Sequence, residues 1–435
     1  MRQKNDQDPV NLADLGQFDY GLIGASLSHS KSQEIHEAFG YYSYRLVNIP
    51  GQDLEAFMKQ RSFKGINVTI PYKETVMDYL DYVDPRAQEI GAVNTIVNQN
   101  GHLLGYNTDY LGFAHSLKAY RIHLKGKKVM VLGSGGASKM VQAYAKDQSA
   151  QEIIVISRSG PKDYQMLDQF QDVDIIINAT PVGMYPHNLE SKIDLANFQH
   201  LDSVIDLIYN PLKTKLLLEA KEKGVKIMSG LLMLVAQAFY ACQIFTDQKL
   251  DKALLDQVYS KVKKDLANIA LIGMPASGKT TMAQLLGQKT GRPVRDIDQL
   301  VEERAGLPIP SLFDQYGEDY FRQLESQVLA EVSKEGGQVI ATGGGSVLRR
   351  ANRQMLAQNS LLVYLNRPVD KLDTSKRPLS KDRTSLKKMA RSRSPLYEGL
   401  ADLQVDVVED KEATLDLIWK GLADNENFSD EWPQY

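Results

Sequence analysis

The chain has 435 residues, of which 43% are hydrophobic and 24% are charged, and its formal net charge is −3. This composition is typical of globular proteins and excludes a disordered or collagen-like chain. At about 150 residues per domain, the length predicts about three compact units. The 51 basic and 54 acidic residues nearly balance, so no overall field attracts nucleic acid or an anionic membrane.

Cysteine content and apolar segments restrict the class of protein further. The single cysteine, Cys242, cannot form an internal disulfide, and zinc sites built from several thiolates are excluded. Residues 1–16 contain no apolar signal-peptide core. The longest apolar stretch, Gly230 to Phe245, is too short to span a bilayer and contains two glutamines. We therefore expect a soluble, cytoplasmic protein with no nucleic-acid or membrane partner.

The first part of the chain alternates predicted strands with a predicted helix. Strands are indicated at 18–24, 43–50 and 64–73, and helical spacing at 30–42. Pro50 and Pro71 stop the second and third strands. Strands alternating with helices favour a mostly parallel α/β sheet.

The second part opens at Lys127 with one strand–helix–strand pattern. Strands are indicated at 127–133, 152–159, 173–181 and 202–211, and helices at 134–148, 231–245 and 249–266. The third part begins at Asn268 with another strand, a glycine loop and a helix. Later strands of the same sheet are expected within 338–348 and 360–368.

The glycine loop of the third part is the strongest motif. Gly273–Thr280, GMPASGKT, matches G-x-x-x-x-G-K-[ST] in full, after a strand and before a helix. Backbone N–H groups of such a loop cradle phosphates, Lys279 can reach the β and γ oxygens, and Thr280 can bind Mg²⁺. Nucleotide contacts are therefore expected at Gly273, Ala276, Ser277, Gly278, Lys279, Thr280 and Thr281.

Later residues indicate the phosphoryl acceptor. Asp296 and Asp298 stand where a second strand should end beside the loop, and such carboxylates can hold a metal through water and orient a hydroxyl. Glycines 343–345 permit close approach of the backbone to a ligand. Lys371–Arg393 has nine basic residues and two acids, which suits a nucleic-acid patch or a cationic lid over ATP. The absence of interleaved aromatic residues favours the lid.

From Asn268 to about Asp416, the sequence resembles shikimate kinases in GMPASGKT, DID, GEDYFRQLE, ATGGGSVL, KRPLS and RSRSPLYEGLAD. The resemblance implies a P-loop kinase α/β domain with a parallel sheet over 267–420, followed by an acidic tail, 421–435. It implies shikimate contacts at Asp298, Arg322, Gly344 and Arg393, and catalytic roles for Lys279, Asp298 and Arg377. Thr280 and Asp296 would hold the magnesium ion.

The earlier glycine loop, Gly133-Ser134-Gly135-Gly136-Ala137-Ser138, is a candidate phosphate turn for a dinucleotide, although Ser138 replaces the third glycine of G-x-G-x-x-G. The next strand ends in Ser157-Arg158-Ser159, where an NAD enzyme would carry an acid for the ribose hydroxyls. Arg158, with Lys162 close behind, suits a 2′-phosphate, so NADP is favoured over NAD. The alternative is a surface arginine that merely follows a strand.

Polar residues further upstream are individually unremarkable. Ser30 and Ser32 suit helix capping, and Lys73 suits a solvated strand end. Asn94 and Asp109 suit ordinary turns.

Jointly, these residues resemble shikimate dehydrogenases from about Tyr20 to Phe245. The motifs LIGASLSHSKSQEIH, GINVTIPYKE, GAVNT, GYNTD, LGSGGAS, NATPVGM, DLIYNP and GLLMLVAQA occur in that family's order. The resemblance implies a substrate domain over 18–120 after an N-terminal extension, 1–17. A Rossmann NADP domain would follow over 121–248, with its last helix returning toward the substrate domain and a connecting helix over 249–266.

The same resemblance assigns roles to residues in the cleft between those domains. Lys73 and Asp109 would be the catalytic pair. Substrate contacts are implied for Ser30, Ser32, Thr69, Asn94, Asp109, Tyr209 and Gln237. Cofactor contacts are expected at Gly133, Ser134, Gly135, Gly136, Ala137, Ser157, Arg158, Ser159, Lys162 and Gly230.

Together the two resemblances predict a bifunctional enzyme of the shikimate pathway. It would reduce 3-dehydroshikimate with NADPH, then phosphorylate shikimate with ATP and Mg²⁺. Two alternatives remain: a quinate dehydrogenase that uses NAD, fused to a kinase, and an inactive metabolite sensor.

Overall fold

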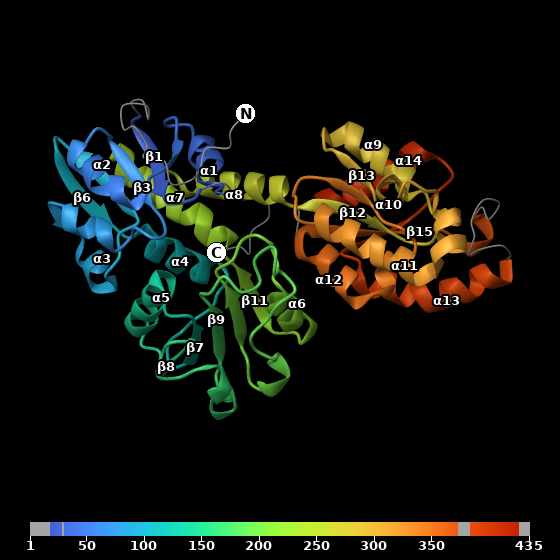
Figure 1. Cartoon of the computed structure of the whole chain (residues 1–435), viewed down its shortest axis with the longest axis horizontal. Helices are drawn as coiled ribbons and strands as arrows, with labels where there is room; N and C mark the ends of the chain where they lie inside the picture. The colour runs from blue at the N-terminus through green and yellow to red at the C-terminus, as the bar shows by residue number, and fades with distance from the viewer. Residues whose placement is uncertain (1–17, 28–29, 373–382, 426–435) are drawn as a thin grey trace.

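The structure is a computed structural model, and it describes residues 18–27, 30–372 and 383–425. These residues form three β-sheets, each the centre of its own unit (Figure 1). We call them the first, second and third unit in chain order. None of the helices in these ranges has the length and apolar character that a bilayer span would need.

The first unit has a mixed sheet with strand order β2-β1-β3-β5-β6-β4. Its elements are β1 (Tyr20–Gly24), α1 (Ser32–Ala38), β2 (Arg45–Asn48), α2 (Leu54–Gln60), β3 (Gly65–Val68), β4 (Tyr82–Val83), α3 (Pro85–Ile90), β5 (Thr95–Gln99), β6 (His102–Tyr106) and α4 (Thr108–Ala119). The sequence favours a mostly parallel sheet, but β5 is antiparallel to both β3 and β6. Asn100 and Gly101 join β5 to β6 with φ values of 53° and 89°, the left-handed conformations that a tight hairpin turn requires.

The second unit has a parallel sheet with strand order β11-β10-β9-β7-β8. Its elements are β7 (Lys128–Leu132), α5 (Gly136–Asp147), β8 (Glu152–Ile156), β9 (Ile175–Asn178), β10 (Ser203–Asp206), α6 (Lys215–Glu222) and β11 (Lys226–Ser229). The chain runs outward from β7 to β8 and then returns to β9 on the other side of β7. In open α/β sheets, a ligand crevice lies at the carboxyl ends of the strands at such a reversal.

Two further helices, α7 (Leu231–Thr246) and α8 (Lys252–Leu266), pack on α1 through a shared core that includes Leu232, Phe239 and Val258. The α7 helix also crosses α4 closely. A Cβ atom on Gly112 of α4 would lie 2.7 Å from the Met233 carbonyl oxygen and 2.8 Å from the Gln237 nitrogen. Glycine at this position therefore sets the spacing of the two helices.

The third unit has a fully parallel sheet with strand order β13-β14-β12-β15-β16. Its elements are β12 (Asn268–Ile272), α9 (Lys279–Thr290), β13 (Val294–Asp296), α10 (Ile297–Ala305), α11 (Ile309–Val332), β14 (Val339–Ala341), α12 (Arg350–Asn359), β15 (Ser360–Asn366), α13 (Arg383–Leu400), β16 (Leu403–Asp406) and α14 (Lys411–Asp424). Helices cover both faces of this sheet, so its three central strands, β14, β12 and β15, are almost entirely buried. Short 3₁₀ helices in the chain span Gly51–Asp53, Thr75–Tyr79, Tyr164–Phe170, Leu195–Asn197, Ser346–Leu348 and Val369–Lys371.

The third unit is joined to the others without a long linker. Ala267 is the only residue between α8 and β12. The Arg292 guanidinium donates hydrogen bonds to the carbonyl oxygens of Lys264 (2.7 Å) and Ala267 (2.6 Å). The α12 helix also packs against α6 of the second unit (Figure 1).

Gly112→Ala is expected to destabilise the pairing of α4 with α7, because the new methyl group meets backbone atoms that cannot rotate away. We expect a loss of about 1–3 kcal/mol in the free energy of unfolding. Denaturant unfolding followed by circular dichroism measures it. Gly136→Ala is the matched control, since a Cβ atom there meets nothing within 4 Å. Equal stability of both variants and the parent chain would contradict a close-packed crossing at Gly112.

Candidate active sites

The first candidate site is a cavity of about 440 Å³ between the first and second units. All eight residues predicted for catalysis and substrate binding in this part of the chain line it. They are Ser30, Ser32, Thr69, Lys73, Asn94, Asp109, Tyr209 and Gln237. Gly230, predicted to contact the cofactor, lines it as well. The structure therefore brings together residues that are up to about 200 positions apart in the sequence.

Lys73 and Asp109 form a salt bridge on the wall of this cavity. Lys73 follows β3 and Asp109 lies in the first turn of α4, and the Lys73 Nζ and Asp109 Oδ2 atoms are 2.6 Å apart. The two side chains are 25% and 19% exposed, so both remain accessible to a molecule in the cavity. A charge-assisted hydrogen bond of this length fixes the ammonium group in place.

A buried polar network supports Asn94 behind the cavity. The Asn94 Oδ1 atom accepts a hydrogen bond from the Thr108 N–H (2.7 Å). Asn67 Nδ2 donates to the Asn94 carbonyl oxygen (3.1 Å), and the Tyr44 hydroxyl donates to Asn67 Oδ1 (2.7 Å). Asn67 was not predicted as a site residue, although it lines the cavity and stands two positions before Thr69.

The two serines lie together at the start of α1. The Ser30 and Ser32 Oγ atoms are 3.1 Å apart, and Ser30 Oγ accepts from the Ser32 N–H (3.2 Å). The N-cap residue of α1 is Lys31 and it makes no side-chain capping bond, so Ser30 stabilises the turn before the helix rather than capping it. Both residues also line the cavity, which capping alone does not explain.

The loop Gly133–Ala137 joins β7 to α5 at the reversal of strand order. Gly133 has a φ of 112°, and a Cβ atom there would lie 3.0 Å from the Ala179 carbonyl oxygen. At Gly135 and Gly136, a Cβ atom would meet no protein atom within 4 Å. This open space at the N-terminus of a twelve-residue helix fits a pyrophosphate, since the helix dipole and free N–H groups favour an anion there.

Ser157, Arg158 and Ser159 follow β8, the next strand along the sheet. Arg158 and Ser159 are exposed, while Ser157 is buried and its Oγ atom has no hydrogen-bond partner among the described residues. An unpaired buried hydroxyl and an exposed arginine fit the ribose phosphate of a dinucleotide. Lys162 instead lies over the Phe170 ring, with Nζ 4.8 Å from the ring centroid. Arg158 is therefore the better placed of the two cations.

The second candidate site begins with the loop after β12. Gly273, Ala276 and Gly278 have φ values of 147°, 64° and 97°, so the loop turns sharply. The buried Lys279 amine donates to the carbonyl oxygens of Gly273 (2.9 Å) and Met274 (2.8 Å) across the loop. Ser277 Oγ is buried and has no partner in the described part of the chain. Donors arranged in this way fit phosphate oxygens.

The oxygen atoms of Thr280 and Asp296 meet beside this loop. Thr280 Oγ1 donates to Asp296 Oδ2 (2.6 Å), and Asp296 Oδ1 caps α10 by accepting from the Asp298 N–H (3.0 Å). Within the described ranges, no group of three or more His, Cys, Asp or Glu residues can hold a metal ion. Mg²⁺ usually takes only one or two protein carboxylates and shares phosphates and waters, so this pair fits magnesium carried by a nucleotide.

Asp298, Arg322 and Arg393 surround the glycine loop after β14. A Cβ atom on Gly343 would lie 2.5 Å from Asp298 Oδ1, and one on Gly345 would clash with the Arg322 guanidinium. The Gly344 carbonyl oxygen accepts from Arg393 Nη1 (2.9 Å). Glycine at 343 and 345 thus leaves room for Asp298 and Arg322, and glycine at 344 leaves room for Pro275 of the Lys279 loop.

Glu325 holds Arg322 in this position. Arg322 Nη1 donates to the fully buried Glu325 Oε2 (2.8 Å), and Ser346 Oγ donates to Oε1 (2.6 Å). Burial alone would lower the pKa of Arg322, but Glu325 and Glu318 more than offset it, so the pKa is raised. Glu325 is the last residue of the GEDYFRQLE motif but is not among the predicted site residues. Its spacing of three residues on a helix was the available signal.

Two further predictions concern residues near these sites. Thr281 lies in the first turn of α9, beside Thr280. Arg377, and with it the middle of the segment expected to form a lid, lies outside the described residues.

Comparisons with known proteins identify both parts of the chain. The family model of the shikimate dehydrogenase substrate binding domain matches residues 22–96, and the model of shikimate kinase matches residues 275–422. The NADP-dependent shikimate dehydrogenase of Clostridium perfringens is 37% identical over 265 residues, which cover 56% of this chain and 98% of that protein.

Solved structures give the same result. Shikimate dehydrogenase 1 of Peptoclostridium difficile is 39% identical with a TM-score of 0.53, covering 56% of this chain and 98% of that one. The Thermus thermophilus enzyme, solved with NADP(H) and shikimate, is 33% identical with a TM-score of 0.51, covering 56% and 99%. The chain therefore belongs to the shikimate dehydrogenase family and carries a shikimate kinase domain over residues 275–422.

Proposed function

We propose that this chain catalyses two consecutive reactions, the NADPH-dependent reduction of 3-dehydroshikimate to shikimate and the ATP-dependent phosphorylation of shikimate to shikimate 3-phosphate. The observation that carries the proposal is that one chain holds both sets of catalytic groups. Lys73 and Asp109 face one cavity, and the Lys279 loop lies beside Asp298 and Arg322 in another unit. We refer to residues 18–266 as the reductase module and to residues 268–425 as the kinase module.

In the reductase module, Lys73 acts as the proton donor. Bound NADPH supplies the hydride that reduces the ketone carbon, and negative charge then develops on the ketone oxygen. The Lys73 ammonium stabilises this charge and gives the oxygen a proton, which it regains from water. Asp109 Oδ2, 2.6 Å away, accepts a hydrogen bond from Lys73 Nζ and so positions the amine on the cavity wall. The substrate is oriented by Ser30 and Ser32 at its carboxylate and by Thr69, Asn94, Tyr209 and Gln237 at its ring oxygens.

In the kinase module, the acceptor is held by charge and geometry. Arg322 and Arg393 bind the carboxylate of shikimate, since a guanidinium group pairs with a carboxylate through two parallel hydrogen bonds. Asp298 accepts a hydrogen bond from the hydroxyl that attacks the terminal phosphate of ATP. Lys279 stabilises the transferring phosphoryl group, while Thr280 and Asp296 are the residues that would hold magnesium, which neutralises phosphate charge.

The two alternatives are less well supported. A quinate dehydrogenase that uses NAD would carry an acid after β8, where this chain has Arg158. An inactive sensor would not need Lys73, Asp109, Lys279 and Asp298 together. Because both NADPH and ATP are cytoplasmic metabolites, we also place the enzyme in the cytoplasm.

Arg158→Ala is expected to weaken NADPH binding more than NADH binding, because only NADPH has the 2′-phosphate. One charge-assisted hydrogen bond contributes roughly 1.5–3 kcal/mol. The Kd for NADH divided by the Kd for NADPH should therefore fall by about tenfold or more. Fluorescence titration of each cofactor measures the ratio. Lys125→Ala, an exposed change near the amino end of β7, is the control. A uniform loss for both cofactors would exclude 2′-phosphate recognition by Arg158.

The two activities are expected to be separable by single substitutions. Lys73→Ala removes the proton donor, so reduction of 3-dehydroshikimate should fall by about 10²–10⁴-fold while added shikimate is still phosphorylated. Lys279→Ala removes a phosphate-binding charge, so the chain should accumulate shikimate. Separate assays of NADPH oxidation and ADP release follow the two reactions. Loss of both reactions in either folded variant would contradict two independent sites.

A further inference from the structure

Two loops of the reductase module carry side chains into its active-site cavity. The loop 181–190 follows the end of β9 and contributes Met184. The loop 207–213 follows β10 and contributes Leu207 and Tyr209. Both loops extend from the cavity toward α12 of the kinase module and end in hydrogen bonds with it.

The loop 181–190 is bound to the kinase module by three of its residues. The Asn188 side-chain Nδ2 atom donates to Gln358 Oε1, and Gln358 Nε2 donates to the backbone carbonyl oxygen of Asn188 (2.7 Å). The Tyr185 hydroxyl donates to the Ser333 carbonyl oxygen (2.8 Å) and accepts from Asn359 Nδ2 (2.8 Å). Leu189 packs against the hydrophobic core of the kinase module. The loop that presents Met184 is therefore anchored to the kinase module through residues that follow Met184 closely in the chain.

The loop 207–213 is bound by the same two kinase residues. The Leu212 N–H donates to Asn359 Oδ1 (2.8 Å), and the Lys213 N–H donates to the Gln358 carbonyl oxygen (3.0 Å). Gln358 is fully buried, and Asn359 is 4% exposed. Hydrogen bonds at buried sites are costly to break, because the remaining partner is left without water. Gln358 and Asn359, the last two residues of α12, thus hold both loops at once.

The reductase module holds the loops at their bases and packs Tyr209 and Leu212 of the second loop against its core of α1, α7 and α8. Buried Asp206 accepts from Asn178 Nδ2 (3.0 Å) at the start of one loop and from Thr214 Oγ1 (2.6 Å) just after the other. Burial raises the pKa of Asp206 to about 7, although its three hydrogen-bond donors act in the opposite direction. Among the described residues, the side-chain amide of Asn188 and the Leu212 N–H donate their hydrogen bonds to the kinase module, while the Leu212 side chain packs on the reductase core.

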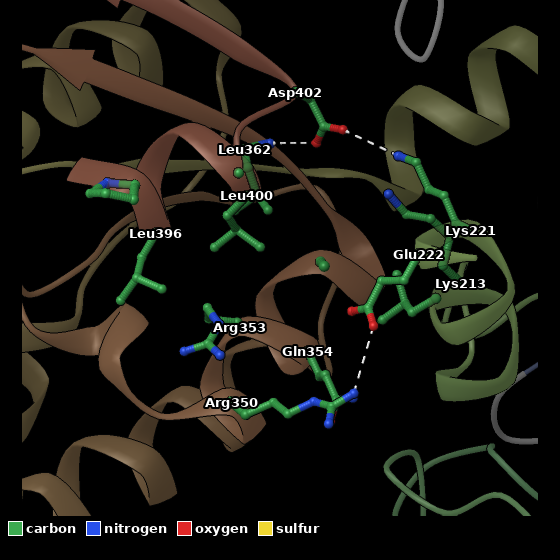
Figure 2. Close-up of a pocket in the computed structure, with 14 residues that line it drawn as sticks. Lys213, Lys221, Glu222, Arg350, Arg353, Gln354, Leu362, Leu396, Leu400 and Asp402 are labelled. Atoms are coloured by element: carbon green, nitrogen blue, oxygen red, sulfur yellow. Dashed lines mark hydrogen bonds and ion pairs between the residues drawn. The ribbon is translucent and has the colours of Figure 1, made fainter. Parts of the chain in front are cut away.

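The rest of the interface between α6 and α12 is more loosely packed. A cavity of about 470 Å³ lies between these helices, with Lys221 and Glu222 on one side and Arg350, Arg353 and Gln354 on the other (Figure 2). Ion pairs cross it between Arg350 and Glu222 (3.6 Å) and between Lys221 and Asp402 (3.8 Å). The first pair is more than 60% exposed on both sides, and exposed pairs contribute little stability. The buried contacts of Gln358 and Asn359 therefore make the specific connection.

We propose that Gln358 and Asn359 of the kinase module are positioning residues of the reductase site, which hold Met184 and Tyr209 in place against the substrate and cofactor. This inference rests on the proposed reductase function. The kinase module thereby completes the reductase site structurally, while its own chemistry is not needed for reduction. The kcat/KM of reduction therefore depends on the contacts that Gln358 and Asn359 make with the loops 181–190 and 207–213.

Three full-length variants test this dependence. Asn359→Ala removes a contact to each loop, and Tyr185→Phe removes only the hydroxyl on the reductase side. Arg350→Ala is the matched control, since it breaks the exposed pair with Glu222 and touches neither loop. We expect kcat/KM for NADPH-dependent reduction of 3-dehydroshikimate to fall by about twofold to tenfold in Tyr185→Phe and further in Asn359→Ala. The loss should appear mainly in KM, and Arg350→Ala should match the parent.

Two additional readouts separate positioning from general destabilisation. In a double-mutant cycle, Tyr185→Phe should cause a smaller loss in the Asn359→Ala background than in the parent, because the shared bond is already gone and only the bond to Ser333 remains to be lost. Hydrogen exchange should quicken in 181–190 and 207–213 of Asn359→Ala, while α1 and α3 keep parental exchange rates. Phosphorylation of added shikimate should stay within about twofold of the parent, a factor equal to roughly 0.4 kcal/mol.

Parental kcat/KM and loop exchange in both Tyr185→Phe and Asn359→Ala would overturn the proposal. Equal loss of reductase and kinase activity in Tyr185→Phe would overturn it as well, because that pattern indicates global destabilisation. Tyr185→Phe keeps the test valid if Asn359→Ala does not fold. A parent chain without reductase activity would refute the proposed function instead, and loop exchange would still report whether the kinase module holds the loops.

Discussion

Parallel strands end at one edge of their sheet, and both sites depend on this constraint. In the second and third units, every predicted binding segment that follows a strand lies at the carboxyl edge. These segments are the glycine loop after β7, residues 157–159 after β8, Tyr209 after β10, Gly230 after β11, the Lys279 loop after β12, Asp296 and Asp298 at β13, and glycines 343–345 after β14. The sheet thus gathers residues from distant parts of the chain, because a loop that follows each parallel strand has to emerge beside its neighbours.

The two modules are packed against each other and are not separate domains joined by a long linker. One residue separates α8 from β12, and Arg292 bonds the end of α8. The product of the reductase is the substrate of the kinase, which accounts for the fusion without requiring direct transfer between sites. The contacts of Gln358 and Asn359 give the fusion a second consequence, since one module supports the active-site loops of the other.

Local sequence patterns predicted much of this arrangement and missed what depends on tertiary contacts. The Lys279 loop and the strands around it follow from glycine spacing and apolar runs, so they were predictable. The hairpin between β5 and β6 was missed, although Asn100-Gly101 is a strong turn signal. Asn67 looks like an ordinary strand residue until the fold places it beneath Asn94. The bond between Asn188 and Gln358 joins residues 170 positions apart, and no local pattern indicates it.

The central claim is that one chain performs reduction and phosphorylation in sequence. The most direct measurement is a coupled assay of the purified chain with 3-dehydroshikimate, NADPH, ATP and Mg²⁺, in which NADPH oxidation, ADP release and the product are followed together. We predict one ADP released for each NADPH oxidised at completion, with shikimate 3-phosphate as the product. Oxidation of NADPH with no phosphorylated product, or phosphorylation of added shikimate with no reduction of 3-dehydroshikimate, would contradict the account.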